Sequence, residues 1–201
     1  MSGLTISTAA IMCGISLCLL SGVVQAIDVK LDDAAITHAV DEGKQIKDVK
    51  QIQVPRFGAD LSKEICGGGG EIRTKKSALQ RLGALIAADP ERAERDKPQV
   101  EQAIQKTADA KELKIAFDFC GDTADFAEDA QATLEQDGRM VKGEMAKPDK
   151  AKKNSEGPAY RGKITASFPY SAFDPNTPAK VTLYPKIGDA MSWDVDFSQI
   201  K

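Results

Sequence analysis

The sequence predicts an α+β protein in which an N-terminal helical region precedes a C-terminal antiparallel β-sandwich-like domain. The first observation is a change of hydrophobic period near residue 112, from about 3.6 residues before it to about 2 after it. The second is the distribution of charge. Residues 1–26 contain no charged side chain, so all 27 basic and 30 acidic residues lie after them. We therefore divide the chain into residues 1–26, a mainly helical region 27–111 and a β domain 112–201.

The uncharged segment is predicted to be a signal peptide. Its apolar stretch, residues 6–24, ends in Val24-Gln25-Ala26, a small-x-small pattern of the kind that signal peptidase cleaves. The alternative is an uncleaved membrane anchor, since about 20 apolar residues span a bilayer. The lack of Lys and Arg in residues 1–5 keeps the anchor open, whereas glycines and serines within the stretch favour cleavage. We expect export to the periplasm or the extracellular medium, with no stable membrane insertion after cleavage.

Cleavage after Ala26 would leave two of the four cysteines, Cys66 and Cys120. An even number of cysteines in an exported chain predicts a disulfide. Its loop of about 55 residues would link the first half of the mature chain to the second. A thiol nucleophile or a metal site would need partner side chains, and the chain has one histidine and no CxxC motif.

Four helices are predicted in the helical region. Each has a capping Asp or Thr before its first turn or a proline within it, followed by apolar residues at helical spacing. Residues 45–54 fit both a strand and a helical turn. The first predicted helix runs from residue 34 to about 43, and the second from 75 to 89. The third begins at residue 90, and the fourth runs from 98 to about 110.

Alternation of apolar and polar residues predicts several strands after residue 112. Asp137-Gly138 is typical of a tight hairpin turn between two of them. Residues 146–158 carry no apolar pattern, and we expect a solvated loop there. The predicted strands are 113–119, the two arms of a hairpin over 131–145, 160–168, 180–184 and 191–197.

The side chains most often used in catalysis are scarce. His38 is the only histidine, which excludes zinc motifs with two histidines, and we expect it on the first helix as a surface or partly buried residue. Gly67–Gly70 precede Glu71 rather than the Gly-Lys-Ser/Thr of a phosphate-binding loop, so we expect a flexible loop beside the disulfide.

Two clusters of charge are candidate binding sites. Five acids between residues 118 and 129 do not match the EF-hand pattern, so an acidic, solvated strand and turn is expected there. Four lysines between residues 147 and 153 lack interleaved aromatics, which favours a solvated loop over a nucleic-acid or lipid contact. The acids are Asp118, Asp122, Asp125, Glu128 and Asp129, and the lysines are Lys147, Lys150, Lys152 and Lys153.

Asp194 and Asp196 are the sharpest candidate catalytic pair. Two residues apart on a strand, they would face the same side about 6–7 Å apart, near the carboxylate separation of glycosidases. Any half-exposed strand gives the same pattern, and Trp193 faces the other way, so it cannot stack a sugar beside them.

The leading interpretation is an exported, non-enzymatic binding or envelope-structural protein. We expect its partner to be another envelope protein or an extracellular ligand, and we expect no nucleic acid, metal or cofactor. The alternatives are a secreted hydrolase that uses Asp194 and Asp196, or the acids at 118–129, and a membrane-tethered envelope protein held by residues 6–24.

Overall fold

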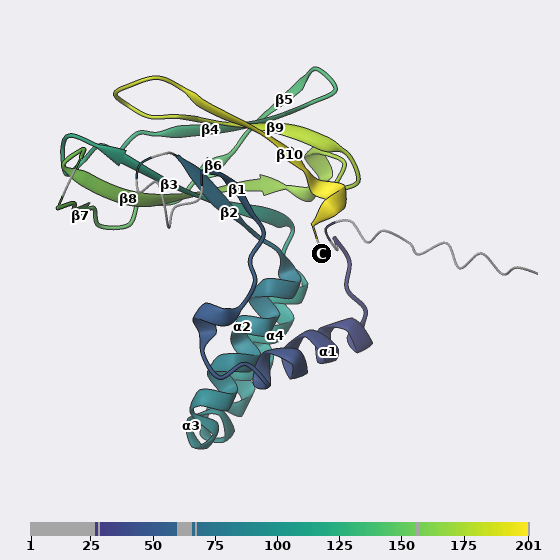
Figure 1. Ribbon diagram of the computed structural model, residues 1–201. Coiled ribbons are helices and arrows are strands. Elements are labelled where there is room, and N and C mark those ends of the chain that lie inside the picture. The colour runs from purple at the N-terminus through teal and green to yellow at the C-terminus, as the bar shows by residue number, and fades with distance from the viewer. Residues whose placement is uncertain (1–26, 28, 60–65, 67, 156, 201) are drawn as a thin grey trace, which may run out of the picture.

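The structure, a computed structural model, describes residues 27, 29–59, 66, 68–155 and 157–200. They form two antiparallel β-sheets packed as a sandwich and a unit of four α-helices that projects from one end of it (Figure 1). The predicted α+β fold class is confirmed. The predicted signal peptide lies outside the described residues. Within the described residues, no helix is long and apolar enough to cross a membrane.

The first two helices of the helical unit begin directly after the expected capping residues. Asp32 Oδ1 accepts from the Ala35 amide at 2.7 Å, and the Thr74 hydroxyl accepts from the Ser77 amide at 3.1 Å. Both contacts satisfy amides that have no partner within the helix. The helices are α1 (Asp33–Lys44), α2 (Lys75–Ala88), α3 (Pro90–Arg95) and α4 (Lys97–Ala108). Their small core centres on Ala39, Val40 and Leu79.

Sheet A has the order β1-β2-β3-β8-β6, with β7 also paired to β8, and sheet B has the order β10-β9-β4-β5. The strands of sheet A are β1 (Arg56–Gly58), β2 (Gly69–Arg73), β3 (Glu112–Gly121), β6 (Glu144–Met145), β7 (Lys152–Lys153) and β8 (Tyr160–Pro169). Those of sheet B are β4 (Gln131–Gln136), β5 (Arg139–Lys142), β9 (Pro178–Tyr184) and β10 (Met191–Asp196). Short 3-10 turns lie at Val49–Gln51, Tyr170–Ala172 and Phe197–Gln199.

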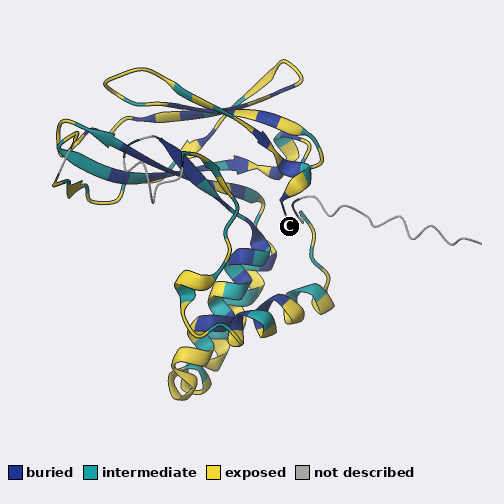
Figure 2. Cartoon of the chain, viewed as in Figure 1, coloured by how far each residue is buried: buried dark blue, intermediate teal, exposed yellow. Residues whose placement is uncertain are grey.

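The main core lies between the two sheets, and alternate residues of β4 and β8 are buried in it (Figure 2). Phe117 and Phe119 of β3 and Phe168 of β8 are almost fully buried there. The outward residues of the same strands are mostly polar, as expected for antiparallel sheets with one wet face.

One strand passes from sheet B to sheet A through Gly143. This residue connects β5 to β6, and its amide donates to Ala132 O of β4 at 2.9 Å. A Cβ at this position would lie 2.9 Å from the Phe168 ring and 3.0 Å from Ala166. Glycine is therefore needed where the chain turns the corner of the sandwich.

Two strands come from the region predicted to be mainly helical. β1 and β2 join sheet A through the pairing of β2 with β3, so the expected flexible loop is wrong for Gly69 and Gly70, which lie in β2. The expected loop at residues 146–158 is also partly paired, because β7 lies within it and Asp149 N donates to Lys163 O at 3.0 Å. The first departure depends on a partner far away in the sequence, because Gly69 pairs with Asp118, whereas Lys152 pairs with the nearby Arg161.

Candidate functional site

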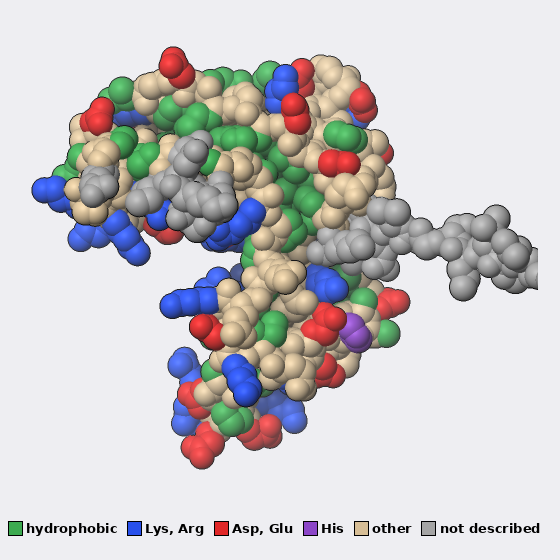
Figure 3. All heavy atoms as spheres, viewed as in Figure 1, with side chains coloured by type: hydrophobic (Ala, Val, Ile, Leu, Met, Phe, Trp, Pro, Cys, Tyr) green, Lys and Arg blue, Asp and Glu red, His purple; other side chains and the backbone are tan. Residues whose placement is uncertain are grey.

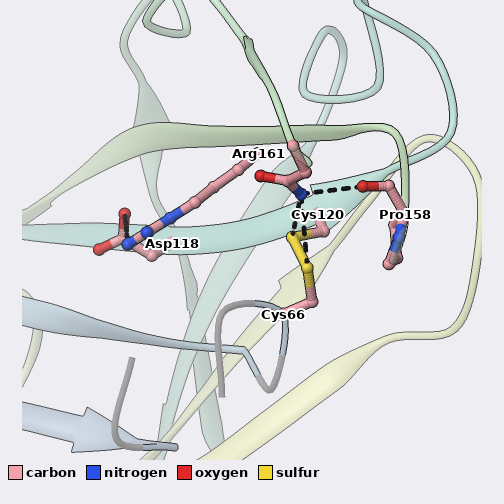
Figure 4. Close-up of a disulfide and its surroundings, with 6 residues drawn as sticks. Cys66, Asp118, Cys120, Pro158 and Arg161 are labelled. Atoms are coloured by element: carbon pink, nitrogen blue, oxygen red, sulfur yellow. Dashed lines mark hydrogen bonds and ion pairs between the residues drawn. A yellow bond between two sulfur atoms is a disulfide. The ribbon is translucent and has the colours of Figure 1, made fainter. Parts of the chain in front are cut away.

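The outer face of sheet A carries a buried carboxylate. Asp118 of β3 and Lys163 of β8 are register partners, and Asp118 is only 5% exposed. Its Oδ2 lies 3.3 Å from Lys163 Nζ, and its Oδ1 lies 3.8 Å from Arg161 Nη2. Figure 4 shows the Arg161 side chain reaching Asp118 beside the disulfide. The expectation of a solvated acid is therefore wrong for Asp118, because β8 covers it with two cations.

Glu71 of β2 extends this network on the same face. Its Oε2 lies 3.2 Å from Lys163 Nζ and 4.0 Å from Arg73 Nη2, and its Oε1 accepts from Arg56. Partial burial by itself would raise the pKa of Glu71. The Lys163 ammonium and the Arg56 guanidinium outweigh that effect and hold the pKa below its usual value. Glu71 therefore stays ionised and fixes Lys163 in place.

A pocket of about 460 Å³, which we call the sheet pocket, opens beside this network. Five cationic side chains line it against two carboxylates, so it carries a surplus of positive charge. Within the part of the chain that the structure describes, Lys150 and Lys152 form no ion pair, and both are exposed. Figure 3 shows Lys and Arg side chains gathered along the underside of the sandwich. The lining residues are Arg73, Asp118, Asp149, Lys150, Lys152, Arg161, Gly162 and Lys163.

The sheet pocket can hold an anion in two ways. Arg161 and Lys163 are positioned by Asp118, so they offer fixed donors whose arrangement costs little entropy on binding. Lys150 and Lys152 lie on the exposed side and raise the local concentration of negatively charged ligands. Such a combination recognises carboxylates or phosphates through charge-assisted hydrogen bonds.

The two predicted bridge cysteines form a disulfide, with their Cα atoms 5.3 Å apart. Asn154 lies against it: its Nδ2 is 3.7 Å from Cys66 Sγ and 3.5 Å from Cys120 Sγ, and it donates to Pro158 O at 2.8 Å. Arg161 is the register partner of Cys120 on β8. The bridge therefore supports the edge of the sheet pocket.

Asp194 and Asp196 do not converge on a reaction centre. Both are exposed; Asp194 lies opposite Lys180 of β9, and Asp196 Oδ1 accepts from the Ser198 amide at 3.0 Å. The second contact caps the turn that follows β10. These are the roles of ordinary surface carboxylates, so the structure gives the hydrolase interpretation no acid–base pair at these residues.

The remaining candidates are also spread over the surface. His38 is exposed on α1, with Nδ1 3.5 Å from Glu42 Oε1. Asp129 pairs with Lys186 at 3.1 Å, and a hydrogen bond from Thr123 lowers the pKa of Asp125. Among the described residues, no group of three or more His, Cys, Asp or Glu side chains is placed to hold a metal ion.

No protein-family model, curated protein or solved structure matches this chain. The sheet pocket is therefore the basis for a functional inference. Sequence patterns missed most of it, because its residues come from four separate segments. The one available signal was Asp118, a charged residue within the apolar run from residue 115 to 119 of β3.

Proposed function

We propose that this chain is an exported, non-enzymatic binding protein whose sheet pocket binds an acidic segment of another envelope protein. The observation that carries the proposal is the surplus of cations in the sheet pocket, two of them held in place by buried Asp118. The disulfide supports export, because such bonds persist in oxidising compartments. A peptide carboxylate suits Arg161 in particular, since a guanidinium can donate two parallel hydrogen bonds to it.

Charge reversal of the two exposed lysines tests this function. We expect K150E/K152E to bind a fluorescein-labelled hexaglutamate peptide about tenfold more weakly at low salt, because two attractive contacts become repulsive. Fluorescence anisotropy measures the affinity. Raising the salt concentration should weaken binding to the unaltered protein, since it screens exposed charges.

The matched control is K142E/K180E, which makes the same change of net charge on exposed lysines of sheet B. It should leave the affinity within about twofold, because these residues lie on the opposite sheet and far from the peptide relative to the screening length. An equal loss in both variants would contradict the proposal, since the peptide would then sense only net charge.

Export has a separate test. We expect mass spectrometry of the protein from its native source to give a mature chain that begins at Ile27, because cleavage after Ala26 follows the small-x-small pattern. A native chain that retains residues 1–26 and stays in the membrane fraction would instead favour the membrane-tethered alternative.

A further inference from the structure

A second pocket, of about 570 Å³, lies where the helical unit meets the sandwich. We call it the junction pocket. Thr74, Lys75 and Ala78, from the start of α2, line one side of it, and Tyr170, which follows β8, lines another. The first turn of a helix carries partial positive charge and free amides, so it favours an anion.

Lys75 supplies a buried cation at this pocket. The residue is 6% exposed, and its Nζ donates to Val29 O at 2.7 Å and to Ala108 O at 2.6 Å. An ammonium has three N–H groups, so one remains. Among the described residues it forms no ion pair with a carboxylate. Burial lowers the pKa of Lys75, and Lys111 lowers it further, with Asp109 opposing both.

Tyr170 supplies a second group without a partner. It is 7% exposed, and within the described part of the chain its hydroxyl makes no hydrogen bond. Buried hydroxyls nearly always have a partner, because leaving one unpaired is costly. Burial raises the pKa of Tyr170 to about 12, so the group keeps its proton and can donate. Lys75 Nζ lies 5.6 Å from the centre of its ring.

The rim of the junction pocket adds further positive charge. Arg73, Lys106, Lys111 and Lys114 line it against two acids, Asp109 and Glu112. The excess of cations at the rim therefore attracts anions. Its two acids repel a dianion more strongly than a monoanion. Ala78, Ala110 and the Tyr170 ring offer apolar surface to the carbon part of a ligand.

We propose that the junction pocket binds a small organic monocarboxylate. One carboxylate oxygen accepts the remaining N–H of Lys75, and the other accepts the hydroxyl of Tyr170. That hydroxyl is closed off from solvent without ligand, so the proposal includes a small shift of the Tyr170 side chain on binding. Two donors match the two oxygens of a carboxylate, whereas a phosphate would leave oxygens without partners. Of its lining residues this site shares Arg73 with the sheet pocket, and the proposal does not depend on the function proposed there.

Isothermal titration calorimetry with acetate, butyrate and inorganic phosphate tests the proposal. The whole mature protein should bind butyrate more tightly than acetate, because butyrate also covers the apolar wall, and should bind phosphate most weakly. Saturable binding of phosphate at least as tight as that of butyrate would overturn the proposal. So would the absence of saturable binding by any of the three.

The variant Tyr170→Phe removes the hydroxyl and keeps the ring. We expect about tenfold weaker butyrate binding, since one hydrogen bond to a charged group is lost. Without ligand the variant should unfold at the same temperature or higher, because an unpaired buried hydroxyl is gone, and this shows that it folds. Unchanged butyrate affinity in Tyr170→Phe would overturn the proposal. K150E/K152E should bind butyrate like the unaltered protein, and a loss there would place the site elsewhere.

Discussion

Replacing both bridge cysteines with serine, C66S/C120S, is expected to lower the free energy of unfolding by about 4 kcal/mol. The two cysteines are 54 residues apart in the sequence, and their bond restricts a long loop of the unfolded chain. That loop contains α2, α3 and α4. The bond therefore links the segment before β2 to the far end of β3, on either side of these three helices. Urea denaturation followed by circular dichroism measures the change.

Reduction provides the internal control. Dithiothreitol should destabilise the unaltered protein by a similar amount and should have no effect on C66S/C120S. A loss below about 1 kcal/mol would contradict the entropic account of the bridge. Such a small loss would indicate that residual structure in the unfolded ensemble already keeps the two segments close.

We expect the C66S/C120S variant also to disturb the sheet pocket. Cys120 is the register partner of Arg161 and lies two residues from Asp118 on the same face of β3. Asn154, which contacts both sulfurs, is close in sequence to Lys150 and Lys152. The disulfide is therefore a structural support for the proposed binding site as well as a link between the halves of the chain.

Short-range signals predicted most of the helices and several of the strands. Thr74 and Asp89 cap helices through their own neighbours, and the prolines fix the next turns, so no distant contact is needed. Asp137 and Gly138 both adopt positive φ, at 50° and 73°, as the hairpin turn between β4 and β5 requires. Such elements are encoded within a few residues.

Strands β1 and β2 could not be predicted in this way. Gly69 and Gly70 have low strand propensity and lie in β2 only because β1 and β3 pair with them on both sides. A Cβ on Gly70 would lie 2.7 Å from a ring atom of Phe57. The glycines are therefore a packing requirement of a crowded sheet, which looks like a flexible loop when the neighbours are unknown.

The candidate site was hidden for a related reason. Asp118 meets Lys163 because of the register between β3 and β8, and a slip of one residue would turn Lys163 to the other face. The sequence between these strands holds all of β4 to β7 and gives no direct measure of that register. Composition could indicate a lysine-rich segment, but it could not show that this segment lies beside a buried carboxylate in the fold.

A single methyl group on α2, in Gly83→Ala, is expected to destabilise the protein by about 3 kcal/mol. The backbones of α1 and α2 meet at Gly43 and Gly83. A Cβ on Gly83 would overlap the Val40 carbonyl oxygen and lie 3.0 Å from Lys44 N, and one on Gly43 would overlap the backbone of Gln80. Because the obstacle is backbone, no rotamer change relieves it, and α1 must move away from α2.

Helix propensity alone predicts the opposite sign. In an exposed helix, Gly→Ala stabilises by about 1 kcal/mol. The matched control is Ala87→Gly, at an exposed position on the same helix, which should cost about 1 kcal/mol through propensity without disturbing the contact. Stabilisation by Gly83→Ala would therefore contradict the close crossing of α1 and α2.

The Gly83→Ala variant also tests whether the two cores of the molecule unfold independently. Trp193, the only tryptophan, packs against the main core from β10, so its fluorescence reports on the sandwich, while circular dichroism at 222 nm is dominated by the helices. The core around Ala39, Val40 and Leu79 shares no buried residue with the core between the sheets. In Gly83→Ala we therefore expect the helical signal to be lost at lower urea than the Trp193 signal. Coincident transitions would mean that the helical unit and the sandwich unfold as one unit, because the contacts at their junction couple them more strongly than their separate cores divide them.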